Sequence, residues 1–321
     1  MSALLEVEGL RVKLPTPTGF ATVVDGVDYR VEQAQVFGIA GESGSGKTIS
    51  MLALLGLLPS GAVVEGRASF GGQDLLRLRS RELRAVSGRD IGMVFQDPMT
   101  SLHPMLSVGR QLTDHVRRHL GLERSAAARR AEELLEQVRI PDPPSALHAY
   151  PHQFSGGMRQ RIAIAIALAC GPRLLIADEP TTALDVTVQA GILRLLDRLR
   201  SERKLSVILI THDLAVMSSI ADHVSIFYAG RVVESGARQD VLQHPRHPYT
   251  RALLDALPHP EAERDTALIA IKGTPPSPQQ IPPGCPYHPR CLYAVDVCSS
   301  QDPPLAPVNG RRLACHVDPF R

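Results

Sequence analysis

The stretch Gly41-Glu42-Ser43-Gly44-Ser45-Gly46-Lys47-Thr48 decides the fold of this 321-residue chain. It fits the pattern G-x-x-x-x-G-K-[ST], whose glycines let consecutive backbone N–H groups curl around phosphate oxygens. In this pattern Lys47 reaches the β and γ phosphates of a nucleotide, and Thr48 offers a hydroxyl to Mg²⁺. A Gly- and Ser-rich loop would match by chance in on the order of one in several hundred chains. The sequence therefore predicts a nucleotide-binding loop.

The segments around this loop alternate between strand and helix. The apolar run VFGIAG leads into the loop, and ISMLALLGLL after it has the density of a buried helix. Residues 4–40 alternate in the manner of strands, and residues 111–140 carry a long helical pattern that ends at the breaker PDPP. Further helices are predicted at Met158–Ala169 and Thr187–Arg203, each followed by an apolar strand. This alternation predicts an α/β sheet.

The second half of a nucleotide site is predicted at the sequence Leu174-Leu175-Ile176-Ala177-Asp178-Glu179. An apolar strand that ends in a carboxylate is the expected partner of a phosphate loop, and Asp178 would hold Mg²⁺ through water. Glu179 is placed to accept a proton from an attacking water. The alternative is that the two carboxylates are only the solvated end of a buried strand.

Composition and charge exclude several classes of protein. Hydrophobic residues make up 44% of the chain and charged residues 21%, which is ordinary globular composition. The formal net charge of +2 is too small for a protein that binds nucleic acid by neutralising phosphates. The longest uncharged stretch, 48–64, is interrupted by Ser, Gly and Pro, so no membrane span is predicted. The N-terminus lacks the features of a signal peptide, and we expect a cytosolic chain with free thiols or metal thiolates.

Four further motifs identify a resemblance to the ATP-binding cassette (ABC) superfamily. The octapeptide Phe154–Arg161 (FSGGMRQR) resembles the signature motif of the family, with Phe where Leu is commoner. Gln96 resembles the glutamine of the Q-loop, Ala183-Leu184-Asp185 the D-loop, and His212 the switch histidine. The motifs follow the order of the family over residues 1 to about 236. The resemblance implies a P-loop NTPase fold with a mixed β core, an antiparallel β subdomain and an α-helical subdomain at about 97–172.

The resemblance also implies roles for single residues. Lys47, Gln96, Glu179 and His212 would be the catalytic residues, with Glu179 as the base and His212 in contact with the γ-phosphate. Thr48, Gln96 and Asp178 would hold Mg²⁺, and Asp185 would belong to the nucleotide site. Members of the family stack adenine on an aromatic residue upstream of the phosphate loop. Phe20 is the nearest candidate, and an ordinary hairpin or core position is its alternative; Tyr29, within a strand pattern, is a poorer candidate.

The signature motif implies a partner. Ser155-Gly156-Gly157 precedes a helix, so its hydroxyl and N–H groups form an anion site. In the family two cassettes pair head to tail, and the signature of one closes over the γ-phosphate held by the other. This chain has one copy of each motif, so the resemblance implies a second cassette.

The C-terminal part has a different composition. From Pro258 to the end, 64 residues hold 13 of the 26 prolines and four of the five cysteines. Such a segment contributes little regular structure, so it is either disordered or fastened by something other than a core. Cys285, Cys291, Cys298 and Cys315 follow C-x5-C-x6-C-x16-C, which indicates a Zn²⁺ or iron–sulfur site, although the absence of C-x2-C weakens zinc. Four unconnected thiols are the alternative.

The stretch His247–Leu254 together with this tail resembles the oligopeptide/dipeptide (and nickel) importer subfamily. We therefore expect two domains, residues 1–236 and an extension at 237–321, with a [4Fe–4S] cluster implied by the resemblance. The implied function is that of the ATPase subunit of a bacterial peptide importer on the cytoplasmic face of the membrane. Its implied partners are a paralogous ATPase, two permease subunits and, through the complex, an extracytoplasmic peptide-binding protein. The alternatives are import of nickel or metal chelates, a soluble cassette that acts as a mechanical switch, and an ATPase regulated by the cluster.

Overall fold

The computed structural model describes residues 3–257 and 271–320, which form two compact units. The loop unit comprises residues 3–31, 37–77, 211–257 and 271–320, and the carboxylate unit comprises residues 32–36 and 78–210. The predicted boundary at 236/237 runs inside the loop unit, because the described part of the extension belongs to the same unit as the phosphate loop. Residues 258–270 of the predicted extension lie outside the described residues.

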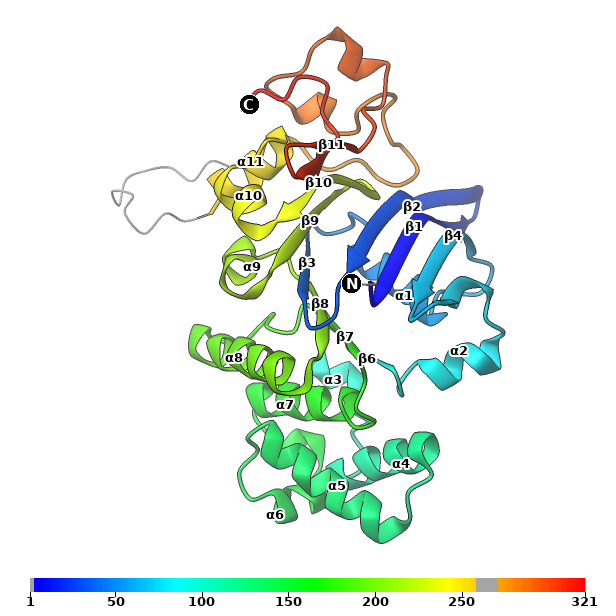
Figure 1. The fold of residues 1–321 in the computed structure, drawn as a ribbon, viewed down its shortest axis with the longest axis vertical. Coiled ribbons are helices and arrows are strands. Elements are labelled where there is room, and N and C mark those ends of the chain that lie inside the picture. Colours follow the sequence, from blue (N-terminus) through cyan, green and yellow to red (C-terminus); the bar gives the residue numbers. More distant parts are fainter. Residues whose placement is uncertain (1–2, 258–270, 321) are drawn as a thin grey trace. The chain divides into compact units, whose positions relative to one another are not determined.

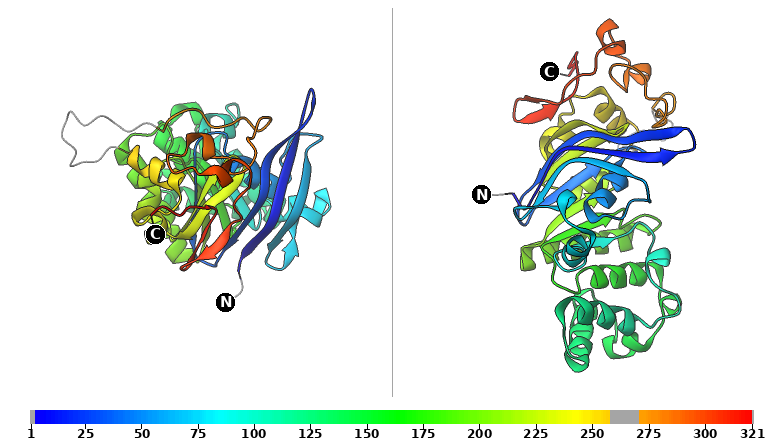
Figure 2. Two further views of the ribbon diagram at one scale, coloured as in Figure 1. Left: turned by 90° about the horizontal axis from the view of Figure 1, so that it is seen from above. Right: turned by 90° about the vertical axis from the view of Figure 1, so that its right-hand side faces the viewer.

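The N-terminal strands of the loop unit form an antiparallel sheet in the order β2-β1-β4-β5 (Figures 1 and 2). The strands are β1 (Leu5–Thr16), β2 (Gly19–Val31), β4 (Val63–Phe70) and β5 (Gln73–Asp74). In β1 and β2 buried and exposed residues alternate, since one face of the sheet is packed and the other is open. This is the antiparallel β subdomain that the resemblance implies.

A second group of strands in the loop unit surrounds β3 (Val36–Ala40), which leads into the phosphate loop. β3 pairs in parallel with β9 (His223–Tyr228), and β9 pairs antiparallel with β10 (Arg231–Ala237). All five residues of β3 are buried. The helices of this unit are α1 (Lys47–Leu55), α9 (Leu214–Ile220), α10 (Arg238–Gln243) and α11 (Pro248–Asp255). The predicted order of strand, loop and helix at residues 36–55 is thus confirmed.

The cysteine-bearing tail contains only short regular elements within residues 271–320. β11 (Ala306–Val308) and β12 (Arg311–Leu313) form a hairpin, and β12 pairs with β10. Of two 3₁₀ turns, η3 (His288–Arg290) lies between Cys285 and Cys291, and η4 (Asp296–Ser299) contains Cys298. Since β11 and β12 have only three residues each, the expectation of little regular sheet or helix is confirmed for residues 271–320.

The carboxylate unit contains three parallel strands, β6 (Ile91–Val94), β7 (Leu174–Asp178) and β8 (Ser206–Ile210), in the order β8-β7-β6. β7 is buried along its whole length and has the bounds of the predicted strand. The helices of this unit, in chain order, are α2 (Ser80–Val86), α3 (Pro98–Ser101), α4 (Val108–Leu120), α5 (Arg124–Gln137), α6 (Pro143–His148), α7 (Gly156–Ala167) and α8 (Val186–Arg203). A 3₁₀ turn, η2 (Pro151–Gln153), precedes α7. In the loop unit another 3₁₀ turn, η1 (Leu75–Arg77), follows β5.

The predicted helical pattern at residues 111–140 is two helices rather than one. Gly121 ends α4 with a φ of 66° in the left-handed region, and its N–H donates to Arg117 O at 3.0 Å. Glu123 then precedes α5, which begins at Arg124. The apolar period continues across the break because α4 buries Leu112 and Val116 and α5 buries alanines and leucines, so periodicity alone hid the turn.

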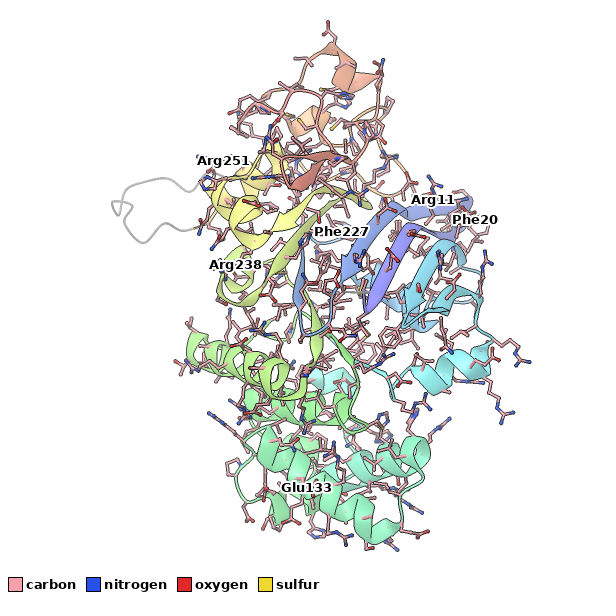
Figure 3. All side chains as sticks on the ribbon, in the orientation of Figure 1. Arg11, Phe20, Glu133, Phe227, Arg238 and Arg251 are labelled. Carbon is pink, nitrogen blue, oxygen red and sulfur yellow. The ribbon has the colours of Figure 1, made fainter. Side chains whose placement is uncertain are left out.

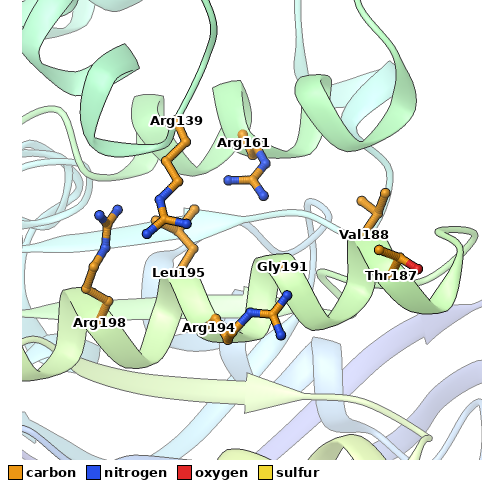
Figure 4. Close-up of a pocket in the computed structure, with 8 residues that line it drawn as sticks. All are labelled: Arg139, Arg161, Thr187, Val188, Gly191, Arg194, Leu195 and Arg198. Carbon is orange, nitrogen blue, oxygen red and sulfur yellow. The ribbon is translucent and has the colours of Figure 1, made fainter.

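An arginine-lined cavity of about 360 Å³ lies in the carboxylate unit between α8 and the helices α5 and α7. Figure 4 shows Arg139 and Arg161 extending toward α8, with Arg198 opposite them. Arg161 donates to Val138 O at 2.8 Å, and Arg198 donates to Gln137 O. These carbonyls lie at the C-terminal end of α5, where the helix dipole favours cations. Burial and the charges of Arg139 and Arg198 lower the pKa of Arg161. The contacts of Arg161 and Arg198 with the end of α5 explain why arginines line this cavity.

Within residues 3–257 and 271–320, no helix has both the length and the apolar character that crossing a membrane requires.

Candidate ATP site and cysteine cavity

The phosphate loop runs from β3 to α1 in a conformation that glycine makes possible. Gly41 has a φ of 147°, and a Cβ there would lie 2.2 Å from Phe227 O. Gly46, with a φ of 97°, is similarly close to Val23 O, at 2.7 Å. A side chain at either position would strike backbone of a neighbouring strand rather than a movable side chain. The loop therefore packs closely against the backbone of β2 and β9.

Lys47 lies buried at the start of α1, and its ammonium group points into the loop. Nζ donates to Gly41 O at 2.7 Å and to Glu42 O at 2.8 Å. Ser45, also buried, lies on the same side of the loop, with its Oγ 3.5 Å from Nζ. A cation that is held by loop carbonyls can exchange them for phosphate oxygens, so the loop of the structure suits the predicted role of Lys47.

The other predicted loop residues lie at the tip of the loop and at the start of α1. Ser43 and Gly44 are exposed at the tip of the loop, and a Cβ at Gly44 would meet nothing within 4 Å. Thr48 is half-buried in the first turn of α1. These positions leave the tip of the loop open to a ligand.

His212 follows Thr211, whose N–H donates to Ile39 O of β3 at 3.1 Å. Asp213 caps α9 by accepting from Ala215 N at 2.8 Å and from Val216 N at 3.3 Å. The backbone on both sides of His212 is thus fixed, one side to the strand of the phosphate loop and the other to α9. The imidazole itself is exposed, as contact with a ligand requires.

In the carboxylate unit, the structure brings two predicted catalytic residues together. Gln96 Nε2 donates to Glu179 Oε2 at 2.8 Å, and Thr182 Oγ1 donates to the same oxygen at 3.0 Å. Asp178, the last residue of β7, is buried. Sequence reasoning missed Thr182, for which the only signal was its position three residues after Glu179.

The backbone of Glu179 has an unusual conformation. Its φ is 47°, in the left-handed region that a residue with a Cβ enters at a cost of about 1–2 kcal/mol. Its N–H donates to Ile210 O at the end of β8, at 2.9 Å. The end of β8 and the two donors to the carboxylate together hold this conformation, and strain of this kind is common at active sites.

Ser155, Gly156 and Gly157 begin α7, and the two glycines differ. Ser155 is the N-cap, and its Oγ accepts from Met158 N at 3.4 Å. A Cβ at Gly157 would lie 2.5 Å from Cγ1 of Val188 in α8, so packing within the chain requires glycine there. A Cβ at Gly156 would meet only Leu184, at 3.7 Å. Nothing in the described chain requires glycine at 156, and the residue is exposed.

Asp185 and the aromatic candidates have defined local roles. Asp185 is the N-cap of α8, and its Oδ1 accepts from the N–H groups of Thr187 and Val188 at 3.1 and 3.0 Å. Tyr29 is buried and stacks on Phe37, with 5.5 Å between ring centroids, so it belongs to the core. Phe20 lies at the β1–β2 turn with 60% of its surface exposed (Figure 3). Of the two aromatic residues, only Phe20 has a ring face available for stacking.

The four tail cysteines line one small cavity in the loop unit. All four are free thiols, and Cys298 is buried. Cys285 N donates to Cys298 O at 2.9 Å, which joins the first and third cysteine segments. Burial, together with the nearby Cys298, Cys315 and Cys291, raises the pKa of Cys285 to about 11, against a hydrogen bond from the backbone of Tyr287. The structure therefore brings together the four residues that the spacing grouped.

Backbone donors accompany three of the four thiols. Burial raises the pKa values of Cys291 and Cys315, whereas hydrogen bonds from the backbone of Tyr293 and Val317 lower them. The backbone of Tyr287 acts on Cys285 in the same way. In each case the donor lies two residues after the cysteine. N–H groups aimed at sulfur stabilise thiolates and tune metal centres, so this donor set suits a thiolate-bound metal group.

Two parts of the sequence match known families. Residues 24–182 match the family described as ABC transporter, and residues 233–298 match the family described as oligopeptide/dipeptide transporter, C-terminal region. The second match covers Cys285, Cys291 and Cys298 of the cavity.

Two curated relatives are similar over nearly the full chain. The oligopeptide transport ATP-binding protein OppD of Salmonella typhimurium is 45% identical over 314 residues, which cover 98% of this chain and 93% of the relative. The dipeptide transport ATP-binding protein DppD of Escherichia coli is 46% identical over 316 residues, which cover 98% and 96%.

Solved structures support the same assignment. The ATP-binding cassette MJ0796, in a dimeric post-hydrolysis state bound to ADP and Pi, has a TM-score of 0.65 and 25% identity, over 73% of this chain and 98% of that one. CbiO1 of Clostridium perfringens, part of the ABC transporter complex CbiONQ, has a TM-score of 0.64 and 28% identity, over 76% and 92%. The phosphate loop, the Gln96–Glu179 pair and the match over the full chain lead to one conclusion: this chain belongs to the ABC transporter ATPases, in the family of oligopeptide and dipeptide transport ATP-binding proteins.

Proposed function

We propose that this chain is the ATP-hydrolysing subunit of a bacterial importer for oligopeptides or dipeptides. The observation that carries the proposal is the 45–46% identity to oligopeptide and dipeptide transport ATP-binding proteins over 98% of the chain, including the C-terminal region. Similarity that extends through the extension favours an importer subunit over a soluble mechanical switch.

The chemistry of the proposed reaction is hydrolysis of the γ-phosphate. The N–H groups of the phosphate loop and Lys47 would bind the phosphates. Thr48, Gln96 and Asp178 present oxygen donors, the ligands that Mg²⁺ prefers, and the ion would neutralise charge on the phosphates. Glu179 would accept the proton of the attacking water. Gln96 and Thr182 both donate to Oε2 of Glu179, and these contacts would orient the carboxylate toward the attacking water.

The proposed cycle requires a second cassette. Ser155, Gly156 and Gly157 of one cassette would close over the γ-phosphate bound to the other, and His212 would contact the same phosphate. We propose a paralogous ATPase as the partner and attachment to the cytoplasmic face of the membrane through two permease subunits. ATP would close the cassette dimer, hydrolysis would reopen it, and the permeases would convert this cycle into alternating access for peptide delivered by an extracytoplasmic binding protein.

Co-purification tests the importer and its cargo. We expect the chain, when isolated from native membranes, to bring down two permeases and a second ATPase. Di- and oligopeptides supplied with the binding protein should stimulate ATP hydrolysis by this complex. Stimulation by a nickel chelate and not by peptides would replace the proposed cargo, and isolation without any permease would overturn the proposal.

We further propose that the four cysteines bind a [4Fe–4S] cluster, with zinc as the alternative. Within the described residues no three His, Cys, Asp or Glu side chains lie close enough together to hold a single metal ion. A zinc ion needs its thiolates about 2.3 Å away, whereas a cluster distributes them over several iron atoms. The cavity measures about 10 Å³, roughly the space of one water, so its lining would have to move for a cluster to bind there.

Anaerobic purification tests the cluster. The protein is expected to be brown, to absorb broadly in the visible range, and to contain iron and sulfide in near-equal amounts. Replacing the buried Cys298 by Ser should remove the colour, whereas the same change at Cys170, outside the cavity, should leave it. A colourless wild-type protein with one zinc per chain would contradict the cluster.

A further inference from the structure

The C-terminal extension contacts the phosphate loop through a buried ion pair. Arg290, in η3, donates from Nη1 to Glu42 Oε2 at 2.7 Å and from Nη2 to Glu42 Oε1 at 3.0 Å. Glu42 is the second residue of the phosphate loop. The side chain of Arg290 is only 5% exposed and that of Glu42 24%. A two-pronged arginine–carboxylate pair of this kind is among the stronger and more directional contacts in proteins.

The guanidinium group is oriented by groups other than Glu42. Arg290 Nε donates to Lys272 O at 2.8 Å, and the guanidinium carbon lies 5.8 Å from the ring centroid of Tyr228 and 5.9 Å from that of Tyr287. Tyr228 and Tyr287 pack against each other edge to face. The cation is therefore fixed in the extension and presented to the loop, rather than drawn from solvent by the carboxylate.

The backbone of Glu42 is held as well. Its N–H donates to the hydroxyl of Tyr249 at 2.9 Å, and Tyr249, in α11, is fully buried. Its carbonyl accepts from Lys47 Nζ at 2.8 Å. One residue of the phosphate loop thus connects the lysine of the ATP site to two residues of the extension.

The charge balance explains why the loop needs this contact. A triphosphate carries several negative charges, and a carboxylate in the loop that binds it would repel them unless a cation neutralised it. The pair also turns the Glu42 carboxylate toward the extension. Because η3 lies between Cys285 and Cys291, the ion pair connects the segment between these two cysteines with the phosphate loop inside one compact unit.

We propose that Arg290 is a positioning residue of the ATP site, which acts by neutralising the Glu42 carboxylate beside the incoming phosphates. The inference rests on ATP binding at the phosphate loop. By this inference the extension contributes to the affinity for ATP, independently of any metal that its cysteines bind.

Calorimetric titration of the full chain with Mg·ATP tests this role. Replacing Arg290 by Gln leaves the carboxylate unpaired, and we expect the Kd for ATP to rise on the order of tenfold. In the hydrolysing complex, KM for ATP should rise while kcat stays within about twofold, because Arg290 acts on phosphate binding and not on the attacking water. The double variant Glu42→Gln with Arg290→Gln removes both charges and should return the Kd to within about twofold of wild type.

The matched control is Arg251→Gln, in the same extension. Arg251 pairs with Asp255 on the exposed face of α11, and loss of a surface pair should leave ATP affinity unchanged. An unchanged Kd for Arg290→Gln, or a double variant as weak as that single variant, would overturn the inference. Should Arg290→Gln fail to fold, the single variant Glu42→Gln decides. Because this variant lacks the negative charge in the loop, the inference requires it to bind ATP at least as tightly as wild type, and weaker binding would contradict it. Wild-type protein that binds no ATP would instead contradict the proposed function.

Discussion

Replacing Glu179 by Gln is expected to abolish ATP turnover while leaving ATP binding intact. The amide has the shape of the carboxylate and can still accept hydrogen bonds from Gln96 and Thr182 through its oxygen. It cannot take a proton from water, and loss of a general base costs about 10²–10⁴ in rate. With hydrolysis blocked, the ATP-bound cassette dimer should accumulate in the closed state.

The measurements are phosphate release, the Kd for Mg·ATP, and the mass of the complex in the presence of ATP. Glu136→Gln is the matched control. The substitution is chemically the same, and Glu136 is exposed on α5 in the same unit, well before β7 in the sequence. We expect this control to hydrolyse ATP at the wild-type rate. Hydrolysis by the Glu179→Gln variant at the wild-type rate would remove Glu179 from the role of base.

The local geometry explains why the amide is the sharper test than alanine. Glu179 already has a left-handed backbone, and Gln bears the same cost there as Glu. Alanine would also remove the acceptor for Gln96 and Thr182, so a loss of activity could arise from a displaced loop. The isosteric change keeps these contacts and alters only the capacity to accept a proton.

Local sequence features predicted the elements that carry the chemistry. The strand Leu174–Asp178 was found with its predicted bounds, because an uninterrupted apolar run that ends in a carboxylate has few other conformations to adopt. The helix predicted from Thr187 to Arg203 begins one residue earlier, at Val186, where Asp185 caps it. By contrast, the apolar period at 111–140 concealed the turn at Gly121, since a glycine inside a periodic stretch is compatible with either outcome.

Contacts between distant segments could not be predicted from the sequence. Gln96 and Glu179 are 83 positions apart, and only the resemblance to a family placed them in one site. Glu42 and Arg290 are 248 positions apart, and neither periodicity nor spacing relates them. In the sequence, Glu42 was a variable position of a phosphate-loop pattern and Arg290 a residue beside a cysteine. Their pairing depends on how the tail folds against β9 and α11, which is a tertiary property.

The two glycines of the signature motif should separate function from stability. In the proposed cassette dimer, a carboxylate introduced by Gly156→Asp would face the γ-phosphate bound to the partner, and we expect turnover of the complex to fall on the order of 10²-fold through charge repulsion. The fold should not suffer, because a Cβ at 156 meets only Leu184 at 3.7 Å and an acidic residue in the first turn suits the dipole of α7. The melting temperature should therefore stay at or slightly above that of wild type.

Gly157→Ala should show the opposite pattern of effects. Its Cβ would lie 2.5 Å from Val188 Cγ1, so α7 and α8 must move apart or Val188 must leave its rotamer, at a cost of about 1–3 kcal/mol. Thermal and denaturant unfolding measure the loss of stability in Gly157→Ala. ATP-driven dimerisation with the partner cassette measures the loss of function in Gly156→Asp. A Gly156→Asp variant that is destabilised but turns over normally would show that the first glycine serves the fold of this chain rather than the phosphate of its partner.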